Sequence, residues 1–391
     1  MKKNTADVPT PFWRNKKVIP FLAQGIFAII IAISLLFLFS NALDGLRQMG
    51  ISLGFDFLKS SASFGISESL IDYTPESSYG TAFLVGVLNT LRVSFFGILI
   101  ASFIGLVVGI SRLSNNWLVN KTASIYVEIF RNTPLLVQIS IWYFAVFLPL
   151  PRIEESTKFL FSYFSNRGTA IPWFNATSGT LVWVSLFIVG LILAVIVWKV
   201  RLKKQIETGD NKRPGIWAIG VILISLITAF LVTFQAPFNI TLPTIGDRSF
   251  MGGLRLSPEF LAILLGLVIY TSTYIGEIVR GGIQSVQKGQ VEAAKALGLK
   301  PSTTMRLVIF PQAIRVIIPP VTSQYLNLIK NSSLAIAVGY QEVVSVGETI
   351  NNQTGKAIES VTIMILVYLT FSLLTSFFMN QFNKRSQIVE R

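Results

Sequence analysis

GQVEAAKALGLKPSTTMRLVIFP, residues 289–311, is a polar, basic segment inside an otherwise apolar chain. Residues 290–297 are mostly strong helix formers. Gly298 follows them, where a helix commonly ends in a left-handed residue. Pro301 suits the first turn of a second helix, and Pro311 is expected to interrupt the chain again. The stretch therefore predicts two short helices joined by a tight glycine turn.

The spacing of the charged, small and proline residues within this stretch also indicates a function. Glu292-Ala293-Ala294 is followed after three residues by Gly298, and nine further residues separate Gly298 from Val308-Ile309-Phe310-Pro311. This resembles the EAA loop of ATP-binding-cassette (ABC) importer permeases, which docks on an ATPase subunit. Val308 and Phe310 replace isoleucine and leucine of that pattern, and Lys300 stands where the family often has serine. The resemblance assigns ATPase coupling to five residues: Glu292, Ala293, Ala294, Gly298 and Pro311. The plainer alternative is an ordinary amphipathic loop.

The composition is that of a membrane protein. Of 391 residues, 52% are hydrophobic and 13% are charged, with a mean hydropathy of +0.61, whereas a soluble domain has about 25% charged residues. We therefore expect an all-α polytopic membrane protein. The net charge of +14 is spread along the chain and is better explained by topology than by nucleic-acid binding.

The absent residue types exclude several kinds of chemistry. The chain has no cysteine and no histidine, so it has no disulfides, no thiolate or imidazole metal ligands and no histidine-based catalytic triad. It also lacks a Gly-x4-Gly-Lys-Ser/Thr loop for phosphate. We expect no cofactor and no metal in this chain, and any ATP that drives it would be bound by a partner subunit.

Eight apolar stretches are candidates for membrane helices, which need about 20 residues each. They are residues 19–40, 81–110, 134–150, 179–198, 216–234, 258–278, 316–344 and 361–379. A cleaved signal peptide is the alternative for the first, but no small-x-small site follows it, which favours an uncleaved anchor. The seventh contains Pro319-Pro320 and the polar run 330–333, so we expect a helix that is broken or lines a cavity.

The positive-inside rule orients these spans. With the N-terminus in the cytoplasm, 24 of the 33 basic residues fall on the cytoplasmic side, together with residues 289–311. The outer loops instead carry acidic residues such as Asp44, Asp56, Glu68 and Asp72. The sequence therefore predicts that both termini are cytoplasmic.

Further motifs extend the resemblance over most of the chain. Asn89-Thr90-Leu91, RNTPLLVQ (131–138), YIGEIVRGGI (274–283) and LNLIKNSSLAIAVGY (326–340) resemble successive motifs of polar amino-acid permeases. The chain resembles in particular the larger permease of general L-amino-acid ABC importers. This implies a type I importer permease in the bacterial inner (plasma) membrane. The implied partners are ATPase subunits, a second related permease or a second copy, an extracytoplasmic solute-binding protein, an L-amino acid and membrane lipid, with no nucleic acid.

The resemblance also suggests a division of the chain. Residues 1–80 would form a cytoplasmic tail, an anchor helix and an outer loop. A permease core would comprise 81–150 and 257–381, separated by an insertion, 151–256, with two extra spans. Residues 382–391 would form a second cytoplasmic tail. Packing against a neighbouring subunit is the favoured role of the insertion.

Polar side chains within spans are candidates for the substrate pathway. They are Gln138, Tyr270, Thr271, Ser272, Thr273, Glu277, Asn331, Ser332 and Ser333. Helix–helix packing is the commoner role of such serines and threonines. Glu277 and Arg280 are spaced to form an ion pair, and we expect Arg92 to reach toward a membrane interface.

Two other functions compete with that of an importer subunit. A self-contained secondary transporter for amino acids should contain intramembrane acidic or histidine relays, but histidine is absent and Glu277 is the single candidate carboxylate at depth. A membrane-embedded enzyme would need a nucleophile–base pair or a metal cluster, and the chain offers neither. The sequence does not identify which amino acid is carried.

Overall fold

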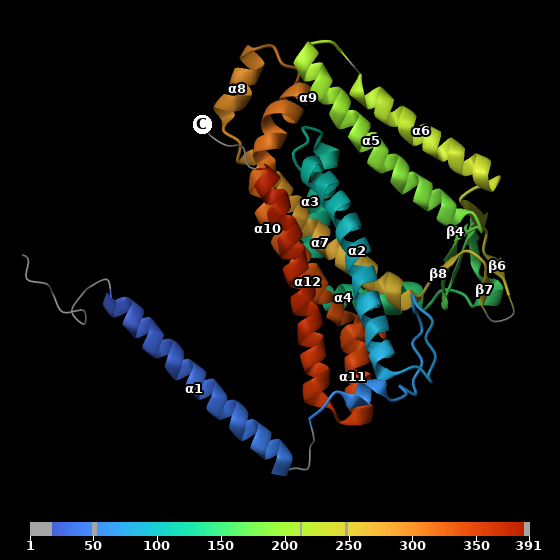
Figure 1. Ribbon diagram of the computed structural model, residues 1–391, viewed down its shortest axis with the longest axis vertical. Coiled ribbons are helices and arrows are strands. Elements are labelled where there is room, and N and C mark those ends of the chain that lie inside the picture. Colours follow the sequence, from blue (N-terminus) through green and yellow to red (C-terminus); the bar gives the residue numbers. More distant parts are fainter. Residues whose placement is uncertain (1–17, 49–52, 212, 247–248, 387–391) are drawn as a thin grey trace, which may run out of the picture.

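The computed structural model describes residues 18–48, 53–211, 213–246 and 249–386. Its centre is a bundle of long helices: α2 (Tyr79–Ser111), α7 (Pro258–Gln284), α10 (Phe310–Asn331) and α12 (Ala357–Ser386). Helix α1 (Val18–Gln48) extends away from this bundle (Figure 1). Its apolar side chains, such as Phe21 and Phe39, are exposed. The expected tails lie largely outside the described residues.

Seven described helices are long and apolar enough to cross a membrane, and a shorter apolar helix spans Leu135–Phe147. The expected all-α membrane protein with about eight spans is thereby confirmed. The expected domain boundaries remain predictions.

Helices α2 and α7 approach unusually closely because glycines remove side chains from their interface. A Cβ at Gly105 would lie 2.6 Å from the Cβ of Ile275, and a Cβ at Gly109 would lie 2.7 Å from the carbonyl oxygen of Gly276. Small residues four apart on one helix commonly allow such contact between membrane helices. The α2–α7 pair is consequently closely packed.

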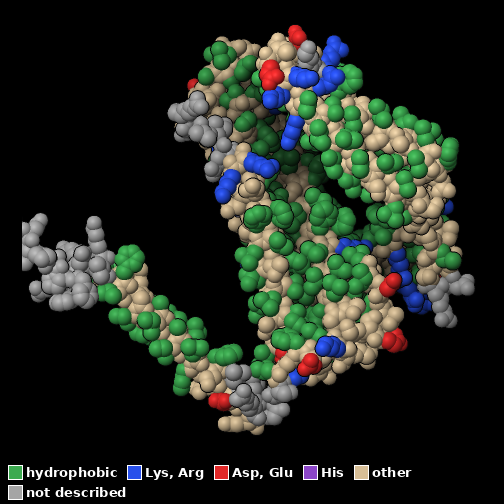
Figure 2. All heavy atoms as spheres, viewed as in Figure 1, with side chains coloured by type: hydrophobic (Ala, Val, Ile, Leu, Met, Phe, Trp, Pro, Cys, Tyr) green, Lys and Arg blue, Asp and Glu red, His purple; other side chains and the backbone are tan. Residues whose placement is uncertain are grey.

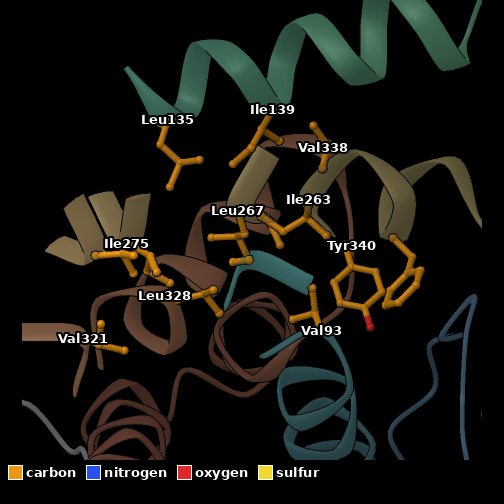
Figure 3. Packing of buried hydrophobic residues seen from close by; sticks show 14 residues of the cluster. Val93, Leu135, Ile139, Ile263, Leu267, Ile275, Val321, Leu328, Val338 and Tyr340 are labelled. Carbon is orange, nitrogen blue, oxygen red and sulfur yellow. The ribbon is translucent and has the colours of Figure 1, made fainter. Parts of the chain in front are cut away.

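The main hydrophobic core lies where α2, α7 and α10 meet the segment after Pro134. Ile139, Ile263, Leu267 and Leu328 are fully buried there. Figure 3 places Val93 of α2 and Tyr340 beside the same cluster. This core positions the polar groups described below.

The expected third span, residues 134–150, is shorter than predicted. Helix α3 (Trp117–Asn132) ends at Asn132, and the next residue, Thr133, has an extended backbone (φ −92, ψ 126) before Pro134. A residue before proline is driven out of the helical region. Helix α4 (Leu135–Ser140) and the π-helix η3 (Ile141–Phe147) follow. Together they hold 13 residues, or about 20 Å, which is less than the hydrocarbon core of a bilayer.

The seventh predicted span is interrupted, but not at Pro319-Pro320. Helix α10 runs through both prolines, and the Ile318 and Val321 side chains beside them are buried. Packing therefore maintains the helix although the prolines remove two backbone donors. The α-helix ends only at Asn331, where a 3-10 helix, η6 (Ser332–Val338), continues to Gly339. Residues 343–344, assigned to the same span, instead begin α11 (Val343–Thr354).

The insertion forms a helical hairpin with short strands at one end. Helices α5 (Thr180–Thr208) and α6 (Pro214–Thr233) pair along their lengths, in agreement with the two predicted extra spans. The strands were not predicted. Three antiparallel sheets contain β1 (Thr157–Phe159), β2 (Ser162–Ser165), β3 (Gly168–Ile171), β4 (Trp173–Ala176), β5 (Phe238–Thr241), β6 (Thr244–Ile245), β7 (Phe250–Met251) and β8 (Leu254–Leu256). A short 3-10 helix, η4 (Ile153–Glu155), precedes β1.

The two ends of the molecule differ in structure. At one end lie α8 (Lys288–Ala296), α9 (Pro301–Thr304) and the turn between α5 and α6 (Figure 1). Toward the other end lie α11 and the 3-10 helix η2 (Asp56–Lys59), where a second core joins Tyr79, Phe83 and Val346. The strands of the insertion lie at the end of the hairpin away from the α5–α6 turn.

Candidate functional site

The segment 289–311 folds as two short helices around a glycine, as its sequence predicts. Helix α8 ends at Ala296, Gly298 is left-handed (φ +72), and Pro301 occupies the first turn of α9. No atom lies within 4 Å of a Cβ added at Gly298, so backbone conformation rather than space requires glycine there. Pro311 does not interrupt the chain: a π-helix, η5 (Met305–Ile309), runs directly into α10. Pro311 lies in the first turn of α10. Proline has no backbone N–H to donate, and the first turn of a helix tolerates that loss.

This loop presents one face to the protein and another to solvent. Ala294 is 3% exposed and anchors α8, whereas the Glu292 and Ala293 side chains are exposed. Leu297, at the end of α8, is 80% exposed. Leu297 therefore presents a large apolar side chain to solvent beside the exposed face of α8. The EAA pattern does not specify Leu297, so sequence reasoning missed it.

Two of the sequence motifs, more than 100 residues apart, meet at the end of α7 nearest this loop. Glu277 forms ion pairs with Arg112 and with Arg280, the latter at 3.0 Å between Oε2 and Nη2. The Arg131 guanidinium lies 5.4 Å from the centre of the Tyr274 ring. Glu277 also lines a cavity of about 390 Å³ together with Arg112 and Arg131. The expected Glu277–Arg280 pair is therefore present, within a larger charged cluster.

Gln138, a pathway candidate, has a structural role. Its side chain is buried, and Nε2 donates hydrogen bonds to the carbonyls of Phe130 (2.7 Å) and Thr133 (3.0 Å). These carbonyls lie at the end of α3, where no further backbone N–H of the helix is available to bond them. The amide therefore bridges the kink between α3 and α4.

The polar run of α7 mostly bonds within the bundle. Thr273 donates to the carbonyl of Tyr270 (2.7 Å), Thr271 is buried, and Ser272 lies 2.7 Å from the hydroxyl of Tyr126. The Tyr270 and Tyr274 hydroxyls are 3.0 Å apart. The sequence did not single out Tyr126, because it lies outside the predicted spans.

The candidates at the end of α10 accompany the change from α-helix to 3-10 helix. The Ser332 hydroxyl is buried and donates to the carbonyl of Ile329 (2.7 Å), while Ser333 donates to Lys330 (2.8 Å). Asn331 is half-buried. These local bonds favour a capping role for the serines.

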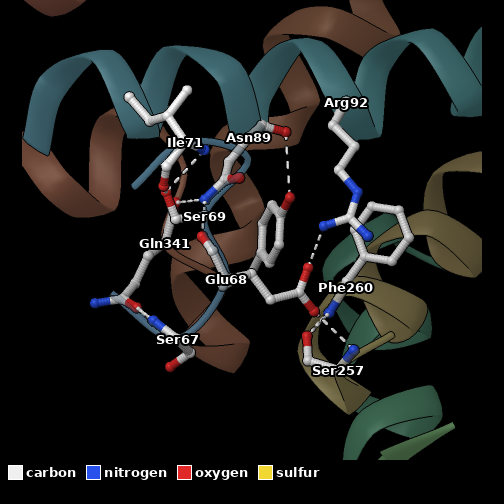
Figure 4. A network of polar contacts seen from close by, with 10 residues as sticks. Ser67, Glu68, Ser69, Ile71, Asn89, Arg92, Ser257, Phe260 and Gln341 are labelled. Atoms are coloured by element: carbon white, nitrogen blue, oxygen red, sulfur yellow. Dashed lines mark hydrogen bonds and ion pairs between the residues drawn. The ribbon is translucent and has the colours of Figure 1, made fainter. Parts of the chain in front are cut away.

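A polar network joins the far end of α2 to α7 and to the segment after η6. Asn89 donates to the carbonyls of Glu68 and Gln341, both at 2.9 Å, and accepts at its own carbonyl from Tyr340 (3.2 Å) (Figure 4). The Glu68 carboxylate accepts from the backbone N–H of Ser257 (2.7 Å). Asn89 belongs to the motif that opens the second span, and its role is thus to join three segments.

The Arg92 side chain has partners within the protein, and its predicted approach to a membrane interface stays a prediction. Its side chain is 11% exposed, pairs with Glu68 and lies with its guanidinium carbon 4.2 Å from the centre of the Phe260 ring (Figure 4). A desolvated ion pair over an aromatic ring holds the arginine in place. The loop 53–78, which sequence reasoning left unpaired, supplies the acidic partner.

The structure thus separates the two sets of candidate residues. Most coupling candidates lie in the loop at one end of the molecule, and most pathway candidates form hydrogen bonds within the helix bundle. Four of the five coupling candidates lie in α8 and the turn after it, and Pro311 lies in the first turn of α10. Of the nine pathway candidates, Glu277 lines the cavity beside Arg112 and Arg131. The described part of the chain is thus a polytopic helical bundle of the kind found in membrane transport proteins, with an exposed helix–turn–helix loop at one end.

Comparisons with known proteins identify the family. The model of the family described as "Binding-protein-dependent transport system inner membrane component" matches residues 97–388. The general L-amino acid transport system permease protein AapQ of Rhizobium johnstonii is 45% identical over 90% of this chain and 88% of its own. The putative amino-acid ABC transporter permease YhdX of Escherichia coli is 44% identical over 96% of both chains.

A third relative is 38% identical over 94% of this chain and 93% of its own. It is the glutamate/glutamine/aspartate/asparagine transport system permease BztB of Rhodobacter capsulatus. A solved structure described as an amino acid ABC transporter with histidines is 21% identical, with a TM-score of 0.46, over 78% of this chain and 95% of its own. The protein belongs to the binding-protein-dependent inner-membrane transport family, as an amino-acid ABC transporter permease.

Proposed function

We propose that this chain is the membrane permease subunit of an ATP-driven importer of L-amino acids. It would form the translocation path and transmit the motion of a separate ATPase through the α8–α9 loop. The observation that carries this proposal is the loop itself: a buried Ala294, exposed Glu292, Ala293 and Leu297, and a glycine turn. The names of the relatives support the substrate class.

The proposal assigns the chemistry to other subunits. ATP binding and hydrolysis belong to the ATPase subunits, and this chain needs no cofactor or metal of its own. An extracytoplasmic solute-binding protein would deliver the amino acid, and a related permease or a second copy of this chain would complete the pore. The chain would lie in the inner membrane with both termini in the cytoplasm.

The charged cluster beside the loop fits such a transmission. Glu277 holds the end of α2, through Arg112, and the last turns of α7, through Arg280. Four residues after α7 ends, α8 begins. A force on α8 would therefore reach the closely packed α2–α7 pair through a short, tied connection rather than through a free loop.

Uptake and ATP hydrolysis by the complete transporter test the coupling role. Glu292→Lys reverses a charge on the exposed face of α8, and Gly298→Asp puts a side chain on a left-handed residue, which costs about 1 kcal/mol. We expect both variants to insert normally but to lose amino-acid uptake and the ATPase activity that substrate delivery stimulates. Glu207→Lys is the matched control, because Glu207 lies at the exposed end of α5 in a weak surface pair with Lys203.

The same measurements separate the proposal from its alternative. Normal uptake in both loop variants would refute coupling through α8. Uptake that survives ATP depletion but collapses with a protonophore would identify a self-contained secondary transporter.

A further inference from the structure

A charged cavity in the described part of the chain, for which no role is assigned, lies between the helix bundle and the insertion. It measures about 470 Å³. The loop 53–78 contributes Glu68, α2 contributes Arg92, α7 contributes its first turn, and the insertion contributes the β2–β3 turn and β8. Figure 2 shows basic and acidic side chains close together in the hollow between the helix bundle and the strands. The insertion therefore forms one wall of an open polar cavity.

The charges around this cavity are only partly paired. Arg92 and Glu68 pair with each other. Arg167 and Arg255 have no carboxylate partner among the described residues, although an Arg255 nitrogen donates to the Arg167 carbonyl (3.3 Å). Glu259 accepts a hydrogen bond from the Tyr143 hydroxyl (3.0 Å) and has no basic partner among the same residues. Two guanidinium groups and a carboxylate thus line one cavity without neutralising one another.

One neutral group of the cavity also has no partner. Asn166 lies in the β2–β3 turn, and its Oδ1 atom is shielded from solvent without a hydrogen-bond donor among the described residues. A shielded acceptor of this kind is costly unless a donor reaches it. A ligand with an N–H group would supply that donor.

The arginines, carboxylates and amide oxygen of this cavity favour a ligand that carries both a positive and a negative charge. A simple anion would meet Glu68 and Glu259, and a simple cation would meet three arginines. A carboxylate pairs well with the planar guanidinium fork, and an ammonium pairs with a carboxylate and an amide oxygen. The volume lies in the range of small-molecule sites, about 300–1,000 Å³.

We propose that this cavity binds a zwitterionic α-amino acid, with Arg167 and Arg255 toward its carboxylate and Glu259 and Asn166 toward its ammonium. The inference rests on the proposed function for its substrate class, and it gives the insertion a role beyond packing. The cavity lies at the α7 end opposite the α8–α9 loop, so it would receive substrate on the outer side.

The chain lacks cysteine, so a single introduced thiol can report on the cavity. Leu70 lines the cavity and is 55% exposed. In membranes that contain the complete transporter without its binding protein, we expect L-glutamine to slow maleimide labelling of the Leu70→Cys chain. L-Glutaminamide, which lacks the carboxylate, and glutaramate, which lacks the ammonium, should not protect. Glu76→Cys, in the exposed part of the same loop, should label equally with and without L-glutamine.

Second substitutions in the Leu70→Cys chain test the assigned contacts. Arg255→Gln and Glu259→Gln should each raise the L-glutamine concentration for half protection about tenfold, the loss expected for one charge-assisted hydrogen bond. Arg255→Lys should restore part of it. Equal protection by all three compounds, or protection unchanged in both neutral variants, would overturn the assignment.

ATP-dependent uptake by the Leu70→Cys transporter distinguishes this inference from the proposed function. Uptake without any protection would reject the cavity as an amino-acid site and leave the importer intact. Protection by L-glutamine in a transporter whose uptake does not depend on ATP would reject the proposed function but would support the amino-acid site.

Discussion

At the scale of single residues, glycines determine how closely the central helices approach. Gly109 faces the Gly276 carbonyl and the Val279 side chain, and a Cβ there would lie 2.7 and 2.8 Å from them. Backbone cannot yield as a flexible side chain does, so α7 would have to move. The four-residue spacing of Gly105 and Gly109 indicates a close helix contact, but the sequence alone does not identify α7 as the partner.

Alanine at Gly109 should therefore destabilise the bundle. We expect Gly109→Ala to cost about 1–3 kcal/mol, as overpacking of a tight interface usually does. The thermal unfolding midpoint of the purified transporter measures this. Gly220→Ala makes the same change in α6, where nothing lies within 4 Å, and should be neutral or stabilising by up to about 1 kcal/mol. Equal midpoints for the two variants would contradict the close approach of α2 and α7.

At the scale of elements, α11 depends on a buried cap. Glu342 lies between the last two spans, and its side chain is fully buried. Its Oε1 accepts from the backbone N–H groups of Val344 and Ser345, both at 3.0 Å, and its Oε2 accepts from the Tyr368 hydroxyl at 2.9 Å. Burial raises the pKa of the carboxyl above 4.5, although these hydrogen bonds act in the opposite direction.

This shift predicts a pH dependence of stability. A carboxyl with a raised folded-state pKa contributes stability that is fully present below the unfolded value of 4.5 and is lost as the pH rises through the folded value. We expect Glu342→Gln, which keeps the size and an acceptor, to flatten the fall of the melting midpoint from acid to neutral pH. Glu342→Ala should lower the midpoint throughout, because it removes the cap and leaves buried donors unpaired, at about 1–3 kcal/mol.

The melting midpoints of wild type and Glu342→Gln, measured from acid to neutral pH, test this prediction. The same slope in wild type and Glu342→Gln would show that another group titrates.

Elements were predictable from sequence where they are long and apolar or carry turn residues. The α8–Gly298–α9 turn and the α5–α6 hairpin are examples. Helix α3 was missed because charges such as Lys121, Glu128 and Arg131 interrupt its apolar pattern. The strands of the insertion are two to four residues long. Such strands are too short to show an alternation of apolar and polar residues in the sequence.

The candidate site was predictable only in part, and for a related reason. The coupling loop is local, so its spacing is visible in the chain. The Glu68–Arg92 pair and the Arg112–Glu277 pair join residues that are distant in sequence. No periodicity shows which helices meet, so the sequence does not reveal that several polar residues of the spans also form hydrogen bonds within the bundle.

At the scale of the whole molecule, charge and architecture indicate one orientation. Lys and Arg side chains gather at the end that carries α8 and α9 (Figure 2). The turn between α5 and α6, next to basic residues such as Lys203 and Lys204, lies at this same end (Figure 1). From the positive-inside rule we predict that this end lies in the cytoplasm. The strands of the insertion and the amino-acid cavity would then lie outside.

Single cysteines at the two ends of the insertion test this orientation, because the chain has none of its own. Leu160, at the β1–β2 turn, is 72% exposed, and the Glu207 side chain at the end of α5 is 58% exposed. A membrane-impermeant maleimide should label Leu160→Cys in spheroplasts and Glu207→Cys only in inside-out vesicles. Labelling of Glu207→Cys from outside would put the α8–α9 loop beyond the reach of a cytoplasmic ATPase. Since ATP is available only inside the cell, that single result would remove coupling through α8 as a mechanism.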